Sequence, residues 1–274
     1  MFDLKNKIVL VVGGRGYLGR DFCQALRSCN ATVIAADLPA KSKAASKSDF
    51  KDEFNDIDQL DVDVTNKNSI SKMMTSIIEK YGHIDTFIYS VTAKPHDFYA
   101  PFTECSLEGW QSVINAELDG LFLVAQEVGR EMEKREQGNI ILISSIYGVV
   151  GNDQRLYKGS NLAELYVDKK QENGESQIYS HSVYPVVKGG IISLTRYLAA
   201  YWGDKNIRVN CISPGGVYHE GENATFIKKY SERVPLGRKA NAREISGTVV
   251  YLTSNESSYV TGQNIIVDGG LTSW

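Results

Sequence analysis

The sequence of 274 residues has few of the features that mark disulfide-rich, metal-binding or membrane-spanning proteins. Its four cysteines are scattered and form neither a C-x-x-C pair nor another metal-ligand spacing, which favours reduced packing residues in a cytoplasmic protein. No apolar segment is long enough to cross a membrane. Residues 1–5 lack the layout of a signal peptide. We therefore expect a cytoplasmic protein without a metal site or a membrane anchor.

An excess of charge is also missing. The chain has 33 acidic and 30 basic residues, a formal net charge of −3, and neither a basic run nor an aromatic-basic stripe. A nucleic acid is therefore not an expected partner. Internal repeats and linkers are absent too, while an apolar share of 42% is enough for a sizeable core. We expect a single domain over residues 1–274.

The first informative pattern in the sequence is an apolar run followed by a glycine-rich turn and a helix. Residues 7–13 (KIVLVVG) predict a buried parallel strand, and residues 17–29 a helix. Glycines in the turn GGRGYLG let the backbone approach a pyrophosphate, which the N-terminus of the helix also attracts. The turn is predicted to bind a dinucleotide through Gly13, Arg15, Gly16, Tyr17 and Leu18.

The next predicted strand, 31–37, ends in the carboxylate of Asp37, about twenty residues after the glycines. A carboxylate at this place suits hydrogen bonds to the adenosine ribose and repels a 2′-phosphate. Because no arginine follows it, we favour NAD over NADP as the cofactor. Two alternatives stay open. Arg15 could contact a phosphate, and Asp37 could be a solvated acid at a strand end.

Strand and helix patterns alternate along the rest of the chain, which predicts an α/β fold. Asp63 and Val64 would end the third strand, where an adenine ring is gripped, and a loop over 91–105 leaves the carboxyl end of the fourth, where such sheets bind ligands. Residues 39–58 predict a polar surface connection. The further strands are predicted at 59–64, 83–90, 138–145, 207–212 and 264–267, and the further helices at 66–81, 106–134, 182–201, 223–233 and 242–252.

Tyr184 and Lys188 stand four residues apart on one of these helices, so they share a face. A fixed ammonium favours phenolate over phenol and lowers the tyrosine pKa. Lowering that pKa from ~10 to ~7 takes about 4 kcal/mol of differential interaction. A tyrosine that titrates near neutrality can pass a proton to or from a substrate oxygen. We interpret the pair together with Ser144 and Ser145 upstream.

With these landmarks the chain resembles the classical branch of the short-chain dehydrogenase/reductase family along nearly its whole length. The resemblance implies an NAD(P)-dependent oxidoreductase acting on CH–OH groups. It also implies a Rossmann-type, doubly wound parallel sheet of seven strands in the order 3-2-1-4-5-6-7, with helices on both faces. The matching landmarks are the turn 13–19, Asp37, Asp63-Val64, Ser144-Ser145, Tyr184 with Lys188, residues 210–216 (NCISPGG), residues 261–263 (TGQ) and residues 268–270 (DGG).

A narrower resemblance connects segments 144–148, 206–210 and 235–238 with oxidoreductases of flagellin and surface-sugar modification. It implies a small-molecule substrate derived from a sugar. The leading hypothesis is therefore the NAD-dependent interconversion of a secondary alcohol and a ketone on such a substrate. A sugar-nucleotide epimerase or dehydratase is the first alternative, because the turn GGRGYLG resembles that of the extended, sugar-nucleotide branch.

The family resemblance also implies residue roles. Tyr184 would be the acid/base, Lys188 would lower its pKa and hold the nicotinamide ribose, and Ser145, in preference to Ser144, would hydrogen-bond the reacting oxygen. The backbone of Pro214, Gly215 and Val217 would contact the nicotinamide carboxamide. The long helices beginning near residues 106 and 182 imply a homodimer or a homotetramer.

Two departures from the family pattern concern the active site. Residues 89–92 (YSVT) replace the usual Asn-Asn-Ala-Gly, although Ser90 can still donate a hydrogen bond to the cofactor. Glu117 stands where the family has an asparagine of a proton relay, because Asn115 lies about 200° away on an ideal helix. Glu117 is predicted to support or replace the relay, or else to be a helix acid with a structural partner. These departures also suggest the second alternative, a cofactor-binding protein with little turnover.

An insertion separates the two catalytic segments. Tyr184 follows Ser145 by 39 positions, far more than family members usually need. The extra stretch, residues 152–178, must loop out over the mouth of the active site. It predicts a substrate-binding lid, with an oligomer contact or a disordered surface loop as the alternative.

Overall fold

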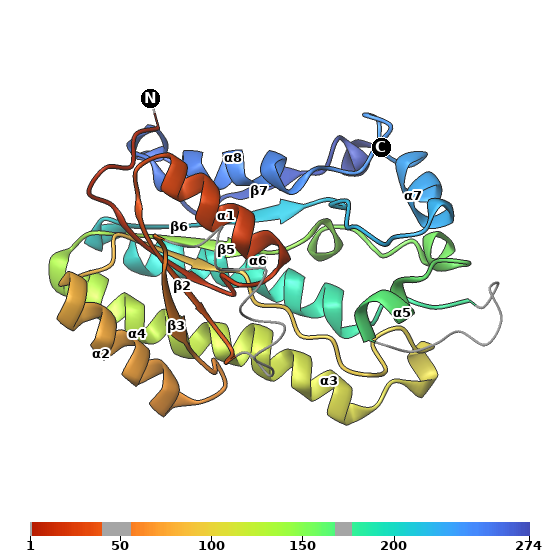
Figure 1. The fold of residues 1–274 in the computed structure, drawn as a ribbon, viewed down its shortest axis with the longest axis horizontal. Helices are drawn as coiled ribbons and strands as arrows, with labels where there is room; N and C mark the ends of the chain where they lie inside the picture. Colours follow the sequence, from red (N-terminus) through yellow and green to blue (C-terminus); the bar gives the residue numbers. More distant parts are fainter. Residues whose placement is uncertain (1, 40–55, 168–176) are drawn as a thin grey trace.

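The computed structural model describes residues 2–39, 56–167 and 177–274. Its centre is a sheet of seven parallel strands in the order β3-β2-β1-β4-β5-β6-β7, which confirms the predicted fold class (Figure 1). The strands are β1 (Ile8–Val12), β2 (Thr32–Asp37), β3 (Asp58–Asp61), β4 (Thr86–Tyr89), β5 (Gly138–Ile143), β6 (Ile207–Pro214) and β7 (Asn264–Val267).

Helices cover both faces of the sheet (Figure 1). One face is covered by α1 (Tyr17–Ser28) and α8 (Ala242–Thr253), and the other by α2 (Lys67–Tyr81), α4 (Gly120–Arg135) and α6 (Val183–Trp202). An apolar cluster fills the space on each side. Burial on both faces explains why the central strands are almost continuously apolar. Among the described residues, no helix is long and apolar enough to cross a membrane.

Helix α2 illustrates how local sequence sets the element boundaries. It begins after Asn66, whose side chain accepts hydrogen bonds from the N–H groups of residues 68 and 69. It ends at Gly82, whose φ of 78° lies in the left-handed region. Between these ends, α2 packs into the core through Ile70, Met73, Met74 and Ile77.

The helix predicted over residues 106–134 is interrupted. Ser106 caps α3 (Leu107–Ile114), since its hydroxyl accepts the N–H of Gly109 at 2.9 Å. A π-helical turn, Asn115–Asp119, then joins α3 to α4. A π turn takes in an extra residue without breaking the apolar pattern on either side, so the sequence could not reveal it. Such turns are frequent at functional sites, and this one contains Glu117.

Two strand ends also differ from the prediction. Strand β3 ends at Asp61, so Asp63 and Val64 lie in the following turn, where the Asp63 carboxylate accepts the N–H of Thr65 at 2.9 Å. Strand β5 ends at Ile143, and the next residues turn into a short 3₁₀ helix. Helices α5 (Leu162–Val167) and α7 (Ala224–Ser231) both lie beyond the end of the sheet, at the right of Figure 1, and residues of both belong to one apolar cluster. Most of the predicted connection at 39–58, and residues 168–176 of the insertion, lie outside the described residues.

Candidate active site

A cavity of about 720 Å³ lies at the carboxyl end of the sheet. Nearly all the residues predicted for catalysis or cofactor binding line it, although they come from distant parts of the chain. Arg15 and Glu117 are the two that do not. The residues that line it are Gly13, Gly16, Tyr17, Leu18, Asp37, Asp63, Val64, Ser90, Ser145, Tyr184, Lys188, Pro214, Gly215 and Val217.

The glycine turn forms one wall and has no space for side chains at its closest points. Gly13 has a φ of +84°, and a Cβ there would lie 2.5 Å from the carbonyl oxygen of Ser90. A Cβ on Gly19 would lie 2.0 Å from the carbonyl oxygen of Gly13. Helix α1 begins after Gly16 without a side-chain cap, so its first N–H groups have no side-chain acceptor. Such an N-terminus suits a phosphate.

Asp37 and Arg15 are held together at the adenosine end of this wall. The Asp37 carboxylate accepts the N–H groups of Arg15 at 3.0 Å and Leu38 at 2.8 Å. The Arg15 guanidinium donates to the carbonyl oxygen of Asp37 at 2.8 Å and to the Asp61 carboxylate at 2.7 Å. Arg15 therefore fastens the ends of β2 and β3 to the turn. Its guanidinium is engaged by protein groups, and its side chain does not line the cavity.

Helix α6 presents Tyr184 and Lys188 to the cavity on the predicted common face. The Lys188 ammonium lies 5.4 Å from the centre of the Tyr184 ring. Ser144 donates a hydrogen bond to the backbone carbonyl of Lys188 at 2.8 Å. Ser145 begins the 3₁₀ helix Ile146–Gly148, and its hydroxyl accepts the N–H of Tyr147 at 3.2 Å. The Ser144 hydroxyl therefore holds α6 against β5, and the Ser145 hydroxyl still has its proton to donate.

A buried ion pair lies behind the tyrosine. Oε2 of Glu117 lies 2.8 Å from Nζ of Lys188, and the two side chains are 0% and 2% exposed. The other oxygen, Oε1, accepts the backbone N–H of Ala93 at 3.1 Å. Burial lowers the pKa of the Lys188 ammonium, but the adjoining carboxylate more than compensates, so the pKa is raised. Glu117 therefore keeps Lys188 charged and joins it to the loop after β4.

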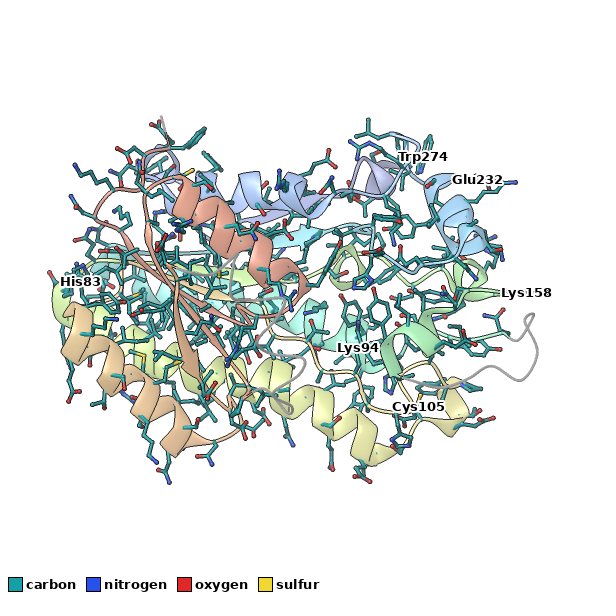
Figure 2. The ribbon with its side chains drawn as sticks, in the orientation of Figure 1. His83, Lys94, Cys105, Lys158, Glu232 and Trp274 are labelled. Atoms are coloured by element: carbon teal, nitrogen blue, oxygen red, sulfur yellow. The ribbon has the colours of Figure 1, made fainter. Side chains whose placement is uncertain are left out.

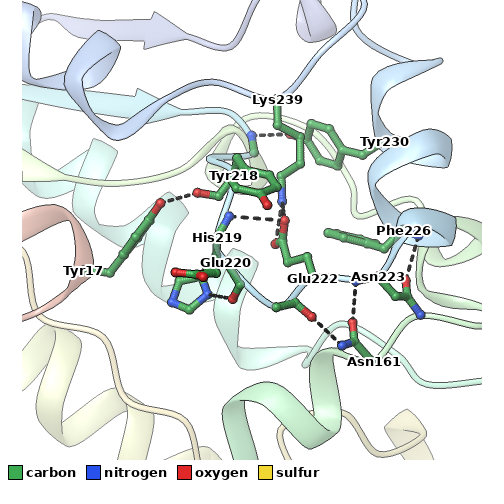
Figure 3. Close-up of polar contacts among 12 residues, drawn as sticks. Tyr17, Asn161, Tyr218, His219, Glu220, Glu222, Asn223, Phe226, Tyr230 and Lys239 are labelled. Atoms are coloured by element: carbon green, nitrogen blue, oxygen red, sulfur yellow. Dashed lines mark hydrogen bonds and ion pairs between the residues drawn. The ribbon is translucent and has the colours of Figure 1, made fainter.

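Three residues of the insertion, Tyr157, Leu162 and Tyr166, line the cavity, as does Ser180 just after it. The insertion is tied to the segment after β6. The Asn161 side chain donates to the carbonyl of Gly221 at 2.7 Å and accepts the N–H of Asn223 at 2.9 Å (Figure 3). We call these two segments, residues 153–167 and 217–234, the roof. That the insertion closes over a substrate stays a prediction.

Several polar residues of the cavity were not predicted from the sequence. Lys239 forms a bidentate ion pair with Glu222, and their side chains are 4% and 3% exposed (Figure 3). Lys94, Tyr166 and His219 also line the cavity. None of them stands in a motif. Only Lys94 had an indication in the sequence, because it lies in the loop over 91–105, which was predicted to leave the sheet at its ligand-binding edge.

Ring contacts connect the two sides of the cavity. Tyr17 from α1 packs against His219 with ring centres 4.6 Å apart, and its hydroxyl donates to the carbonyl of Tyr218. His219 packs against Tyr166 of α5 at 5.3 Å. The Lys94 ammonium lies 3.3 Å from the centre of the Tyr166 ring. These contacts form a continuous row, which runs from the glycine turn to the roof and on to the loop after β4.

Comparison with known proteins places this geometry in a family. The family model described as short chain dehydrogenase matches residues 7–162, and the one described as enoyl-(acyl carrier protein) reductase matches residues 172–272. The post-translational flagellin modification protein A of Campylobacter coli is 32% identical over 270 residues, covering 97% of this chain and 98% of that protein.

Solved structures agree over the whole chain. A short chain dehydrogenase from Leptospira borgpetersenii with bound NAD+ superposes with a TM-score of 0.81 at 33% identity, covering 98% of this chain and 94% of that one. A gluconate 5-dehydrogenase from Burkholderia cenocepacia in complex with NADP and tartrate superposes with a TM-score of 0.81 at 26% identity, covering 100% and 98%. The neighbours thus include binders of either dinucleotide.

Proposed function

The chain belongs to the short-chain dehydrogenase/reductase family and is an oxidoreductase of its flagellin-modification branch, and from this premise we propose that it interconverts a secondary alcohol and a ketone on a sugar derivative with NAD(H). One observation supports the proposal above all. Ser145, Tyr184 and Lys188 line the same cavity as the glycine turn and Asp37. Catalytic and dinucleotide-binding groups therefore face a common space.

The residues present fit a nicotinamide dinucleotide. The turn around Gly13 has no room for a Cβ, and α1 begins beside it without a side-chain cap. Asp37 lines the cavity, whereas the guanidinium of Arg15 is bound to Asp37 and Asp61 instead of facing it. A carboxylate without a free arginine disfavours a 2′-phosphate, and we therefore propose NAD(H). The cofactor supplies or accepts the hydride.

Side chains of the protein transfer the proton that accompanies the hydride. We assign Tyr184 as the group that donates a proton to the substrate oxygen during reduction and accepts it during oxidation. The Ser145 hydroxyl donates a hydrogen bond to the same oxygen and stabilises its developing negative charge. The Lys188 ammonium lies 5.4 Å from the Tyr184 ring centre, and we assign it to hold the nicotinamide ribose beside the tyrosine. Glu117 is a positioning residue that acts through Lys188.

The assignment of a sugar-derived substrate rests on the relatives and on the cavity walls. One relative is named for flagellin modification, and one structural neighbour is a gluconate dehydrogenase. Behind the catalytic tyrosine, the cavity is walled by aromatic side chains together with hydrogen-bonding and charged groups. Such mixed walls suit a polar ring or chain with apolar C–H faces.

Isothermal titration with NAD+ and with NADP+ tests the cofactor assignment. We expect NAD+ to bind more tightly, and Asp37→Ala to reduce that preference by at least about tenfold, because the substitution removes a charge-assisted hydrogen bond and a repulsive charge. The Tyr184→Phe variant is the matched control, since it should bind NAD+ normally. Equal affinity for the two dinucleotides in the unsubstituted protein would overturn the assignment.

Turnover tests the reaction class. We expect absorbance of NADH to appear when NAD+ and a suitable secondary alcohol are added, and Tyr184→Phe to abolish it. Product formation without any net change in NAD+ would instead favour the epimerase or dehydratase alternative. Binding of NAD+ without turnover on a broad panel of alcohols and ketones would favour the cofactor-binding alternative.

A further inference from the structure

Three lysines line the cavity, and two of them are neutralised by a carboxylate of their own. Lys188 is paired with Glu117, and Lys239 with Glu222. The third, Lys94, forms no ion pair with any carboxylate of the described residues. Its ammonium instead lies 3.3 Å from the centre of the Tyr166 ring. Figure 2 shows Lys94 beside α5, in the middle of the molecule and not at its rim.

The loop after β4 fixes Lys94 close to the catalytic groups. The N–H of Ala93, its neighbour in the chain, donates to Oε1 of Glu117 at 3.1 Å, and the same carboxylate holds Lys188. On its other side Lys94 reaches the roof through Tyr166. The loop therefore connects the carboxylate of the catalytic ion pair with the roof, and Lys94 lines the cavity there.

The surroundings of Lys94 leave its charge poorly stabilised. Protein atoms displace water around the ammonium and lower its pKa to about 8, although Glu117 and Glu222 act in the opposite direction. Each of those carboxylates is already bound to another lysine. An aromatic face gives a cation only about 0.5–2 kcal/mol. A carboxylate on the ligand would supply the charge-assisted hydrogen bond that the protein does not.

The charges of the three lysines and their carboxylate partners indicate which kind of anion suits the cavity. The pairs Glu117–Lys188 and Glu222–Lys239 each sum to zero, so Lys94 leaves one positive charge. A neutral sugar leaves that charge unmatched, and a diphosphate-linked sugar brings more than one negative charge. We propose that Lys94 binds the carboxylate of the substrate, and hence that the substrate is a sugar acid or a related hydroxy acid. This inference rests on the proposed function and names the substrate class of the same site.

Titration calorimetry of the NAD+-saturated protein with matched ligands tests the inference. D-gluconate and D-glucitol are one pair and D-galactonate and D-galactitol another, because the members of each pair differ only in a carboxylate against a hydroxymethyl group. We expect at least one acid to bind about tenfold or more tightly than its neutral counterpart. Lys94→Met should remove the difference, and Lys94→Arg should retain most of it.

Lys158→Met is the matched control, because Lys158 is an exposed lysine of the roof that does not line the cavity. It should leave the preference intact, and NAD+ affinity should be the same in all variants. The inference is overturned if no acid binds more tightly than its counterpart, or if the preference survives in Lys94→Met. Hydride transfer to NAD+ from neutral polyols only would overturn it while leaving the proposed function in place. Absence of hydride transfer from every substrate would count against the proposed function. The binding comparison would still test whether Lys94 binds a carboxylate, because it does not depend on turnover.

Discussion

Lys188 has a bound carboxylate beside it, so the charge that faces Tyr184 is not that of an isolated ammonium. Glu117 lies 2.8 Å from Nζ and is completely buried. In a water-excluded site, the carboxylate offsets part of the lysine's field at the neighbouring ring. The same carboxylate keeps Lys188 protonated and in place. At the scale of single residues, Glu117 therefore affects both the stability of the site and its pH dependence.

Substitutions of Glu117 separate these two effects. Glu117→Ala leaves a buried ammonium without a partner, and we expect it to destabilise the protein by about 3–5 kcal/mol, measured by denaturant unfolding. Glu117→Gln keeps the shape and removes the negative charge. Without that charge, burial should lower the pKa of the Lys188 ammonium, because the carboxylate is what raises it, so the rate should change with pH at a lower pH than in the unsubstituted protein. If both variants fold and retain the rate and pH profile of the unsubstituted protein, Glu117 has only a structural role.

Lys94 gives a second prediction for pH. Desolvation lowers its pKa to about 8, against the opposing influence of Glu117 and Glu222, while the Tyr166 ring packs on the ammonium. The lysine is therefore charged below pH 8 and loses its proton above it. The dissociation constant of a sugar acid should rise several-fold between about pH 7 and pH 9, while that of a neutral polyol stays level. In Lys94→Arg the rise should disappear, because an arginine stays protonated throughout this range. A level dissociation constant in the unsubstituted protein would contradict the prediction.

Sequence reasoning found the residues of the motifs but not their partners. Tyr184, Lys188 and Asp37 were predicted because fixed spacings or strand ends identify them. The role of Arg15 stayed open, because its partners stand at the ends of β2 and β3, 22 and 46 positions further along the chain. The pair Glu222–Lys239 and the position of Lys94 under Tyr166 depend likewise on contacts between distant segments.

Among the elements, the roof is the part that distinguishes this active site. Asn161 joins the insertion to the segment after β6 through two hydrogen bonds, to Gly221 and Asn223. The Asn223 side chain returns a third bond to the carbonyl of Gly159 at 2.8 Å. This joint connects the segment that carries Tyr166 with the segment that carries Glu222, the partner of Lys239. We therefore expect changes in the roof to affect substrate binding and to leave dinucleotide binding unchanged.

Asn161→Ala tests the roof directly. Loss of two hydrogen bonds should cost about 1–3 kcal/mol of stability, measured by urea unfolding. We expect KM for the substrate to rise several-fold while the affinity for NAD+ is unchanged. Asn152→Ala is a matched control, because Asn152 also lies in the insertion but bonds to Ser180 instead of the segment after β6. An unchanged KM together with weakened self-association would support the oligomer-contact alternative instead of the lid.

The elements themselves could largely be predicted. Strands such as β1 and β5 are buried on both faces, so their sequences are continuous apolar runs that stand out from the amphipathic helices. The π turn at Asn115–Asp119 was missed, because the segment NAELD contains no proline or glycine that would mark an interruption. That Glu117 takes part in a proton relay stays a prediction. Glu117 is buried and Asn115 is exposed.

At the scale of the whole molecule, the active site lies at the carboxyl end of the sheet. A second surface of interest is formed by the outer sides of α4 and α6. The outer sides of α4 and α6 expose Phe122, Tyr197 and Tyr201, which are 52%, 63% and 57% exposed. Tyr197 and Tyr201 stack with ring centres 6.0 Å apart. A cluster of large exposed aromatic side chains on adjoining helices is typical of a protein–protein contact.

We therefore predict that copies of the chain associate through α4 and α6, in keeping with the homodimer or homotetramer that the family resemblance implies. Sedimentation equilibrium should give a dimer or tetramer for the unsubstituted protein. Phe122→Glu combined with Tyr201→Glu should weaken association at least about a hundredfold, because two buried carboxylates would face an apolar contact. Tyr259→Glu, a change at a fully exposed tyrosine of another face, should have a smaller effect. The turn that contains Glu117 leads into α4, and α6 carries Lys188. A dissociated double variant that keeps full turnover would therefore show that each copy's site is complete by itself. Parallel loss of turnover would mean that association keeps α6 in its active position.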